Sequence, residues 1–131
     1  MKTKVKFILA MLIVFSSAFS NLEAANKIQI DSKQASEMLN KDKKIIVLDV
    51  RTAVEFNEGH IKGAVNIDIR QPDAYSKLDK LNHSVKYLVH CRTNHRSGIA
   101  TDYMVQKGFK STYQIMDGFP GWAANNLPWV K

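Results

Sequence analysis

The sequence of 131 residues contains a single cysteine, Cys91, and therefore no internal disulfide. A domain of about this length buries roughly two thirds of the surface of its unfolded chain, which is enough for a hydrophobic core without cross-links. An unpaired cysteine is either a candidate reactive group or a buried thiol that packs as a small, inert apolar side chain.

The chain also lacks an apolar run long enough to cross a membrane, which takes about 20 residues. Its N-terminal run, 7–19, has thirteen residues and contains two serines. Three lysines precede this run, and a segment with small residues, "SSAFSNLEAAN", ends it, in the order typical of a secretory signal peptide. We therefore expect residues 1–24 to be a cleaved signal peptide and residues 25–131 to form one periplasmic or secreted domain. Cleavage after Ser20 and after Ala24 both fit, so the cut site stays open; no cysteine lies there, which excludes a lipoprotein anchor.

Repeats, low-complexity segments and metal-ligand spacing are absent as well, since the four histidines are scattered. The formal net charge is +7, and removal of the first 24 residues, with three lysines and one glutamate, leaves +5. Apart from Lys41, Lys43 and Lys44 this surplus is spread along the sequence, which does not indicate nucleic-acid binding. The surplus instead eases the approach of small anions.

Strand and helix patterns alternate along the rest of the chain. Apolar runs predict strands at 27–30, 44–50, 64–67, 86–91 and 112–116. Helical spacing predicts helices at 31–39, 75–81 and 97–109, and a turn at 117–122 leads to a short final helix. Asp31 with Gln34 forms a candidate capping box, Ser97 is the expected N-cap of the third helix, and Gly108 is its expected stop. Continuous apolar strands separated by helices predict an α/β fold with a parallel sheet covered on both faces.

Cys91 lies where a buried strand meets a helix start, and ligands of parallel sheets bind at the carboxyl ends of the strands. The free amides and dipole of a helix N-terminus favour a negative charge, and Arg92, His95 and Arg96 add cations. Both features favour the thiolate, which is the nucleophilic form of cysteine. We expect an open, amide-lined bowl that holds this thiolate and binds an anionic substrate by charge-assisted hydrogen bonds.

The sequence leaves alternatives for the other residues near the thiol. His95 is either an acid or base or a bystander. Asn94 tolerates the left-handed backbone that a tight loop requires. Nothing in the sequence requires the hydroxyl of Thr93 to point inward, and His90 is expected to be buried packing.

Three stretches resemble the rhodanese-like domain family. "LDVRTAVEFNEGHIKGAVNI" at 48–67 is similar to the family signature D-V-R-x-x-x-E-F-x-x-G-H-I-x-G-A-x-N-I. "CRTNHRS" at 91–97 matches the active loop, and "DGFPGWAANNLPW" at 117–129 is similar to the G-x-x-x-W-x-x-x-x-x-P ending. The matches follow the family's order and span most of the chain after the signal peptide. Asn94 stands where many members have glycine, which leaves the loop geometry open, and Lys62 stands where many have proline.

The resemblance implies a rhodanese-like three-layer domain, with a five-stranded parallel sheet and helices on both faces. It implies a sulfurtransferase without cofactor or metal, in which Cys91 is the catalytic nucleophile. Cys91 would take sulfane sulfur from a small anionic donor such as thiosulfate and pass it, as a persulfide, to cyanide, a small thiol or a protein. The substrate-binding loop, with amides directed at the terminal sulfur, would consist of Arg92, Thr93, Asn94, His95 and Arg96. No nucleic-acid partner, no stable membrane association after signal cleavage and a monomer are expected.

The signature also contains charged residues for which we expect a structural role. Asp49, Arg51, Glu55 and His60 can satisfy one another around the turn that follows the strand at 44–50. A catalytic role for any of them is the alternative.

Two other functions stay open. The chain could be a persulfide carrier or a non-catalytic interaction module, because the sequence supplies a nucleophile and its loop but no second domain for an acceptor. Related phosphatases and arsenate reductases have five residues between cysteine and arginine, whereas four separate Cys91 from Arg96. The shorter ring favours sulfur over phosphate chemistry.

Overall fold

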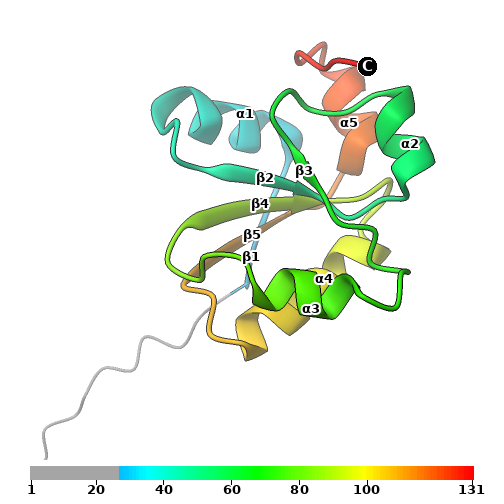
Figure 1. Ribbon diagram of the computed structural model, residues 1–131. Helices are drawn as coiled ribbons and strands as arrows, with labels where there is room; N and C mark the ends of the chain where they lie inside the picture. The colour runs from blue at the N-terminus through cyan, green and yellow to red at the C-terminus, as the bar shows by residue number, and fades with distance from the viewer. Residues whose placement is uncertain (1–26) are drawn as a thin grey trace, which may run out of the picture.

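Five parallel strands form one sheet, and the helices that connect them cover both of its faces (Figure 1). The computed structural model describes residues 27–131, so the expected signal peptide lies outside the described residues. The strands are β1 (Lys27–Ile30), β2 (Ile46–Asp49), β3 (Val65–Asn66), β4 (Lys86–His90) and β5 (Ser111–Ile115), in the spatial order β1-β5-β4-β2-β3. The predicted five-stranded parallel sheet is confirmed.

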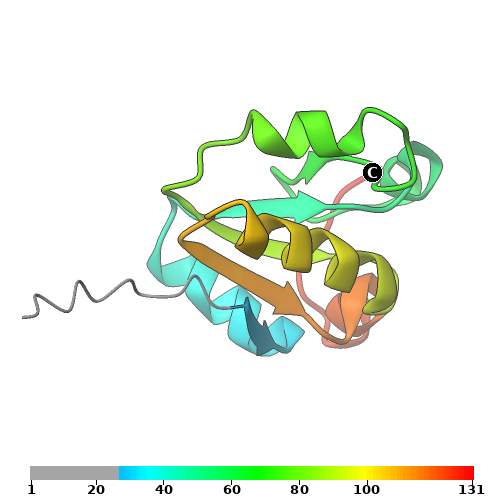
Figure 2. The same cartoon turned by 90° about the horizontal axis from the view of Figure 1, so that it is seen from below.

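The helices lie in two layers. They are α1 (Ser32–Lys41), α2 (Ala53–Glu58), α3 (Ala74–Asp79), α4 (His95–Gln106) and α5 (Gly118–Ala124). Figures 1 and 2 show α3 and α4 on one face of the sheet and α1 and α5 on the other. The predicted three-layer α/β domain is therefore confirmed.

Alternation along the central strands explains why the chain forms this sandwich. Successive side chains of a strand point to opposite faces, so a strand buried on both sides has to be apolar throughout. In β2, Val47 packs with the core under α1 and α5, whereas Leu48 packs with the core under α3 and α4. In β4, Leu88 joins the first core and Val89 the second. Each such fully buried side chain contributes roughly 1.5–3 kcal/mol.

Local sequence signals set several helix ends. Asp31 and Gln34 form the predicted capping box at the start of α1. Gly108 has φ of +83°, a left-handed conformation that suits glycine, and it follows α4 as predicted. No helix within residues 27–131 is long and apolar enough to cross a membrane.

Three local predictions are wrong: one helix was not predicted, and two helices begin earlier than predicted. The sequence patterns predicted no helix between 50 and 64, yet α2 forms there, and Thr52 and Glu55 cap it reciprocally. Helix α4 begins at His95, with Asn94 as N-cap, so Ser97 lies inside the helix. Helix α5 begins at Gly118, within the expected turn.

Candidate active site

Cys91 directly follows β4 at the carboxyl edge of the sheet, as expected, but it is fully buried. Its side chain packs in the core under α3 and α4. The open bowl predicted from the sequence is therefore wrong for this conformation, because the Cys91 side chain has no exposed surface. The next four residues, 92–95, are all exposed.

The main chain of the loop is fixed to the start of α5. The carbonyl of Cys91 accepts a hydrogen bond of 2.9 Å from the amide of Phe119. Gly118 has φ of +61°, and a Cβ atom there would lie 2.3 Å from the carbonyl oxygen of Arg92. Only glycine permits this close approach, so the similarity noted at 117–129 has a structural cause at its first glycine.

A polar network surrounds the sulfur. The thiol of Cys91 lies 3.5 Å from the hydroxyl oxygen of Ser97, in the first turn of α4. Gln114 of β5 donates from Nε2 to this hydroxyl at 3.1 Å and to the carbonyl of Asn94 at 2.8 Å. The Ser97 hydroxyl also lies 3.2 Å from that carbonyl. Because Gln114 supplies it with a proton donor, the hydroxyl can direct its own proton to a Cys91 thiolate or to Asn94.

Asn94 has a main-chain role, although a different one from that predicted. Its φ is −141°, which is not left-handed; among the described non-glycine residues only Asn126 has positive φ. Its carbonyl accepts a hydrogen bond of 2.9 Å from the amide of Gly98, in addition to those from the side chains of Gln114 and Ser97. Its own side chain makes no cap hydrogen bond, so the first amides of α4 have no side-chain acceptor from the N-cap.

Arg96 ends the loop and is held by an acidic partner. Its Nη1 and Nη2 donate to the two carboxylate oxygens of Glu55 at 2.7 and 2.9 Å. This hydrogen-bonded ion pair lowers the pKa of Glu55 from 4.5 to about 2. Thr52 also donates to Glu55, from its amide and its hydroxyl. The bidentate geometry fixes the direction of the guanidinium.

The charged residues of the signature do not form one network. Asp49 and Arg51 do pair, with 2.7 Å between Oδ2 and Nη2, but Glu55 pairs with Arg96 instead. Nδ1 of His60 is hydrogen-bonded to the carbonyl of Phe56 at 2.8 Å, and the His60 ring stacks on the Phe56 ring. The expectation that all four satisfy one another is wrong, because Glu55 lies on α2 facing the cysteine loop.

The Asp49–Arg51 pair contacts several residues near the site. Arg51 donates to the carbonyl of Gly59 at 2.7 Å, and its guanidinium lies 4.3 Å from the centre of the Phe119 ring. His90 is fully buried beside this pair, with Nε2 3.5 Å from Asp49 Oδ2. Burial lowers the pKa of His90, so its ring is neutral at pH 7. The expected packing role of His90 agrees with this position.

The exposed residues of the loop face two different clefts. Arg92 contributes to a cleft of about 320 Å³ between α2 and the start of α5, lined also by Arg51, Glu55, Glu58, Gly59, Phe119 and Pro120. Asn94 and His95 contribute to another, of about 340 Å³, beside β1 and β5. Thr93 is exposed and lines neither cleft. Arg92 thus lines one of these clefts, and Asn94 and His95 line the other.

Two residues of the site were not predicted from the sequence. Gln114 is a buried polar residue in an otherwise strand-like stretch, and this pattern was its only local signal. Ser97 was interpreted as a helix cap rather than as a partner of the thiol. Among residues 27–131, no group of three or more potential ligands lies close enough to hold a metal ion.

The fold and a lone cysteine in a Cys-x4-Arg loop at the carboxyl edge of a parallel sheet define a class of single-domain α/β proteins with a thiol site. The family model of the rhodanese-like domain matches residues 31–125, and the chain belongs to this family. The predicted family is therefore confirmed.

Named relatives give the family a general activity. The chain is 30% identical over 101 residues to the thiosulfate sulfurtransferase GlpE of Glaesserella parasuis, covering 76% of this chain and 90% of that one. It is 30% identical over 103 residues to a sulfurtransferase of Allochromatium vinosum, covering 78% and 94%. A crystal structure of a rhodanese-related protein from Thermoplasma volcanium superposes with a TM-score of 0.70 at 28% identity, covering 79% of this chain and 97% of that one. The chain is thus of the rhodanese sulfurtransferase type.

Proposed function

We propose that the protein transfers sulfane sulfur from thiosulfate, or a similar small anionic donor, to a thiophilic acceptor through a persulfide on Cys91. The observation that carries this proposal is the position of the only cysteine, between β4 and the start of α4, at the first residue of the Cys-x4-Arg loop. The relatives named thiosulfate sulfurtransferase support the same donor class.

The reaction has two nucleophilic displacements. The thiolate of Cys91 attacks the outer sulfur of thiosulfate, a sulfur–sulfur bond forms to Cys91, and sulfite leaves with the electron pair of the broken bond. Cyanide, or a thiolate, then attacks the outer sulfur of the persulfide and regenerates the Cys91 thiolate. Cyanide yields thiocyanate, and a thiol yields its own persulfide. This is covalent catalysis in a ping-pong order.

Residues around the sulfur have distinct parts in this scheme. The helix of twelve residues that starts at His95 directs its N-terminal dipole at the loop, which stabilises an anion there. The Ser97 hydroxyl can donate to the thiolate, with Gln114 as its supporting donor. Arg92 is exposed and free of ion pairs within residues 27–131, so its guanidinium is available to attract the donor.

The burial of Cys91 adds a requirement. A donor can reach the sulfur only when neighbouring groups move, because the Cys91 side chain has no solvent-accessible surface in this conformation. The attachment of the loop to Gly118 and to the Glu55–Arg96 pair restricts that movement at both ends. Because the main chain is also held at the carbonyl of Asn94, we expect opening to involve the exposed side chains of the loop rather than displacement of its main chain.

We also propose where the protein acts and in which oligomeric state. The lysine-rich start and short apolar run of residues 1–24 support export to the periplasm or secretion. A monomer acting on small molecules or on a protein acceptor is proposed from the size of the domain. The competing role is that of a persulfide carrier. The buried sulfur of Cys91 favours this role if slow exposure of the sulfur limits turnover.

A thiosulfate:cyanide assay tests the proposal. Wild type should produce thiocyanate, and Cys91→Ser should produce none while keeping the same circular dichroism spectrum and thermal midpoint. Wild-type protein that forms the persulfide but releases no thiocyanate would indicate a carrier. Hydrolysis of an aryl phosphate that depends on Cys91, without sulfur transfer, would replace the proposal with phosphatase chemistry.

A further inference from the structure

The fold gathers lysines that are far apart in the sequence at the end of the sheet opposite Cys91. Parallel strands all begin at one edge, and the preceding helices all end there. Eight exposed lysines lie in these connections or at the element ends that flank them, and we call this set the basic pole: Lys41, Lys43, Lys44, Lys62, Lys80, Lys86, Lys107 and Lys110. The sequence alone presents these charges as mostly scattered.

Contacts between the connections show that they adjoin. Lys110, before β5, donates its amide to the carbonyl of His83, in the connection before β4. Lys43, before β2, and Lys62, before β3, line the same cleft. Lys41 is in the last turn of α1, and this turn leads into β2. The pole therefore extends across the amino ends of β2, β3, β4 and β5.

The charge of this end is unbalanced. Two acidic residues, Asp42 and Asp79, accompany the eight lysines, which leaves an excess of six positive charges. The rest of residues 27–131 contains eight cationic and nine acidic side chains. None of the eight lysines has an ion-pair partner among the described residues. The whole net charge of the domain is thus concentrated at one end.

Helix stability explains only part of this set. Lys41, Lys80 and Lys107 lie at helix C-termini, where a cation offsets the negative end of the dipole. The other five lysines lie in connections or at a strand start and have no such partner. Mutual repulsion among them costs stability. A polyanion bound at this end would relieve that repulsion.

The composition of the pole favours a diffuse anionic surface over a protein partner. Protein interfaces are enriched in arginine and aromatic residues and depleted in lysine. Here every cation is a lysine, a compact charge suited to non-directional attraction. The aromatic side chains nearest in sequence, Tyr87 and Phe109, are buried and cannot anchor a partner.

A second feature distinguishes a lipid from a nucleic acid. The cleft between Lys43 and Lys62 has a volume of about 320 Å³, and its other lining residues are Leu39, Ile45, Val47 and Gly63. Two cations beside an apolar floor suit an amphiphile with an anionic headgroup, whereas a nucleic-acid backbone offers no apolar part.

We propose that the basic pole binds the anionic headgroup surface of a phospholipid membrane. The contact is electrostatic, reversible and salt-dependent, and it is distinct from a stable anchor. It places Cys91, at the far end of β4, on the side away from the lipid; five strand residues at about 3.3 Å each separate the two ends by roughly 16 Å. The inference is independent of sulfur transfer.

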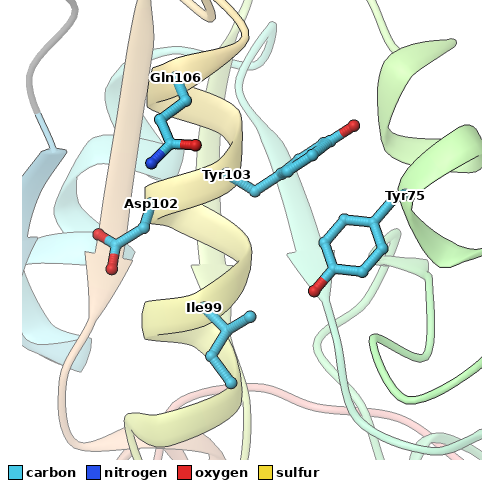
Figure 3. A pocket seen from close by; sticks show the side chains of 5 residues that line it. All are labelled: Tyr75, Ile99, Asp102, Tyr103 and Gln106. Atoms are coloured by element: carbon cyan, nitrogen blue, oxygen red, sulfur yellow. The ribbon is translucent and has the colours of Figure 1, made fainter.

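A groove also lies on the α3–α4 face, outside the basic pole. Tyr75 of α3 and Ile99, Asp102, Tyr103 and Gln106 of α4 line this groove of about 430 Å³ (Figure 3). Nothing in the structure indicates what would cover it.

Co-sedimentation of the full chain with vesicles tests the basic pole. The readout is the ratio of partitioning onto vesicles with anionic phosphatidylglycerol to partitioning onto pure phosphatidylcholine. The N-terminal segment, with its three lysines, is common to wild type and every variant, so differences between them report on the domain. Wild type should strongly prefer the anionic vesicles at low salt. The preference should vanish at about 1 M salt, where charges are screened beyond roughly 3 Å.

Matched variants assign the effect. Each lysine near an anionic surface contributes on the order of a few-fold in partitioning, so the double variant K43Q/K62Q should lower the ratio about tenfold. The control K33Q/R70Q, which removes exposed cations near the carboxyl edge, should change it less than about twofold. Thermal unfolding of both variants verifies the fold. Equal ratios for the two variants, no preference in wild type, or complete displacement by duplex DNA at equal phosphate concentration would overturn the proposal.

Discussion

Arg96, the last residue of the Cys-x4-Arg loop, is bound through both guanidinium nitrogens to the carboxylate of Glu55, which precedes it by 41 residues. This pair links α2 to the loop that follows Cys91, although the sequence motif presents Arg96 as a ligand for substrate. Substrate binding by Arg96 stays a prediction, whereas its pairing with Glu55 is observed in the structure. Loss of Glu55 should therefore affect both the stability of the domain and the position of the loop.

Replacement of Glu55 by Gln should lower the free energy of unfolding by about 1–2 kcal/mol, because a partly buried bidentate pair contributes more than an exposed one. Urea unfolding measures this change. Glu58→Gln is the matched control, since Glu58 is exposed on the same helix and has no ion-pair partner among the described residues. If both variants lose the same stability, the pair is not what holds the loop.

The stability should also depend on pH through Glu55. The folded-state pKa is lowered from 4.5 to about 2, so the pair stabilises the fold fully above pH 4.5, and this contribution disappears as the pH falls toward 2. The difference in unfolding free energy between wild type and Glu55→Gln should therefore be constant from pH 7 to about 5 and shrink below it. A difference that stays constant down to pH 2 would contradict the assigned pKa.

Replacement of Ser97 by Ala should slow persulfide formation without unfolding the domain. The variant removes the hydroxyl that lies 3.5 Å from the sulfur and leaves Gln114 without one of its two acceptors. One hydrogen bond to an anion corresponds to a loss of roughly tenfold in rate. Rapid mixing with thiosulfate followed by mass spectrometry measures the rate, with Ser84→Ala, an exposed serine, as control. An unchanged rate would show that Ser97 only packs against the thiol.

Replacement of Gly118 by Ala should destabilise the domain by more than about 2 kcal/mol, since the new methyl group would overlap the carbonyl of Arg92 and the backbone is left-handed. Gly63→Ala isolates the backbone effect, because Gly63 has φ of +79° and no atom lies within 4 Å of the position that its Cβ would take. It should cost only about 1 kcal/mol. Equal losses would mean that the contact with the loop is unimportant.

The sheet and most helices could be predicted because their signals are local. The apolar runs that contain Val47 and Leu88 are short enough for strands and apolar on both faces. Helix α2 was not predicted because it has only six residues, too few for a helical repeat of apolar side chains. Its capping box at Thr52 and Glu55 lies within the family signature, where a turn was expected.

The site was only partly predictable, because its contacts join distant segments. The position of Cys91 follows from the strand that precedes it. The partners of the loop do not: Gln114 lies on β5, and Glu55 lies on α2. The burial of the sulfur is also a tertiary property, since Cys91 packs in the core together with residues of α3 and α4. The grouping of the lysines follows from the strand order, which no local pattern contains.

Intact-mass measurement of the protein after brief incubation with thiosulfate and rapid desalting tests the role of Cys91. We predict that wild type gains the mass of one sulfur atom, that Cys91→Ser gains none, and that added cyanide removes the gain with release of thiocyanate. Wild-type protein that stays at its original mass with thiosulfate, mercaptopyruvate and glutathione persulfide alike would show that the covered thiol is inert, and sulfur transfer by this domain would be contradicted.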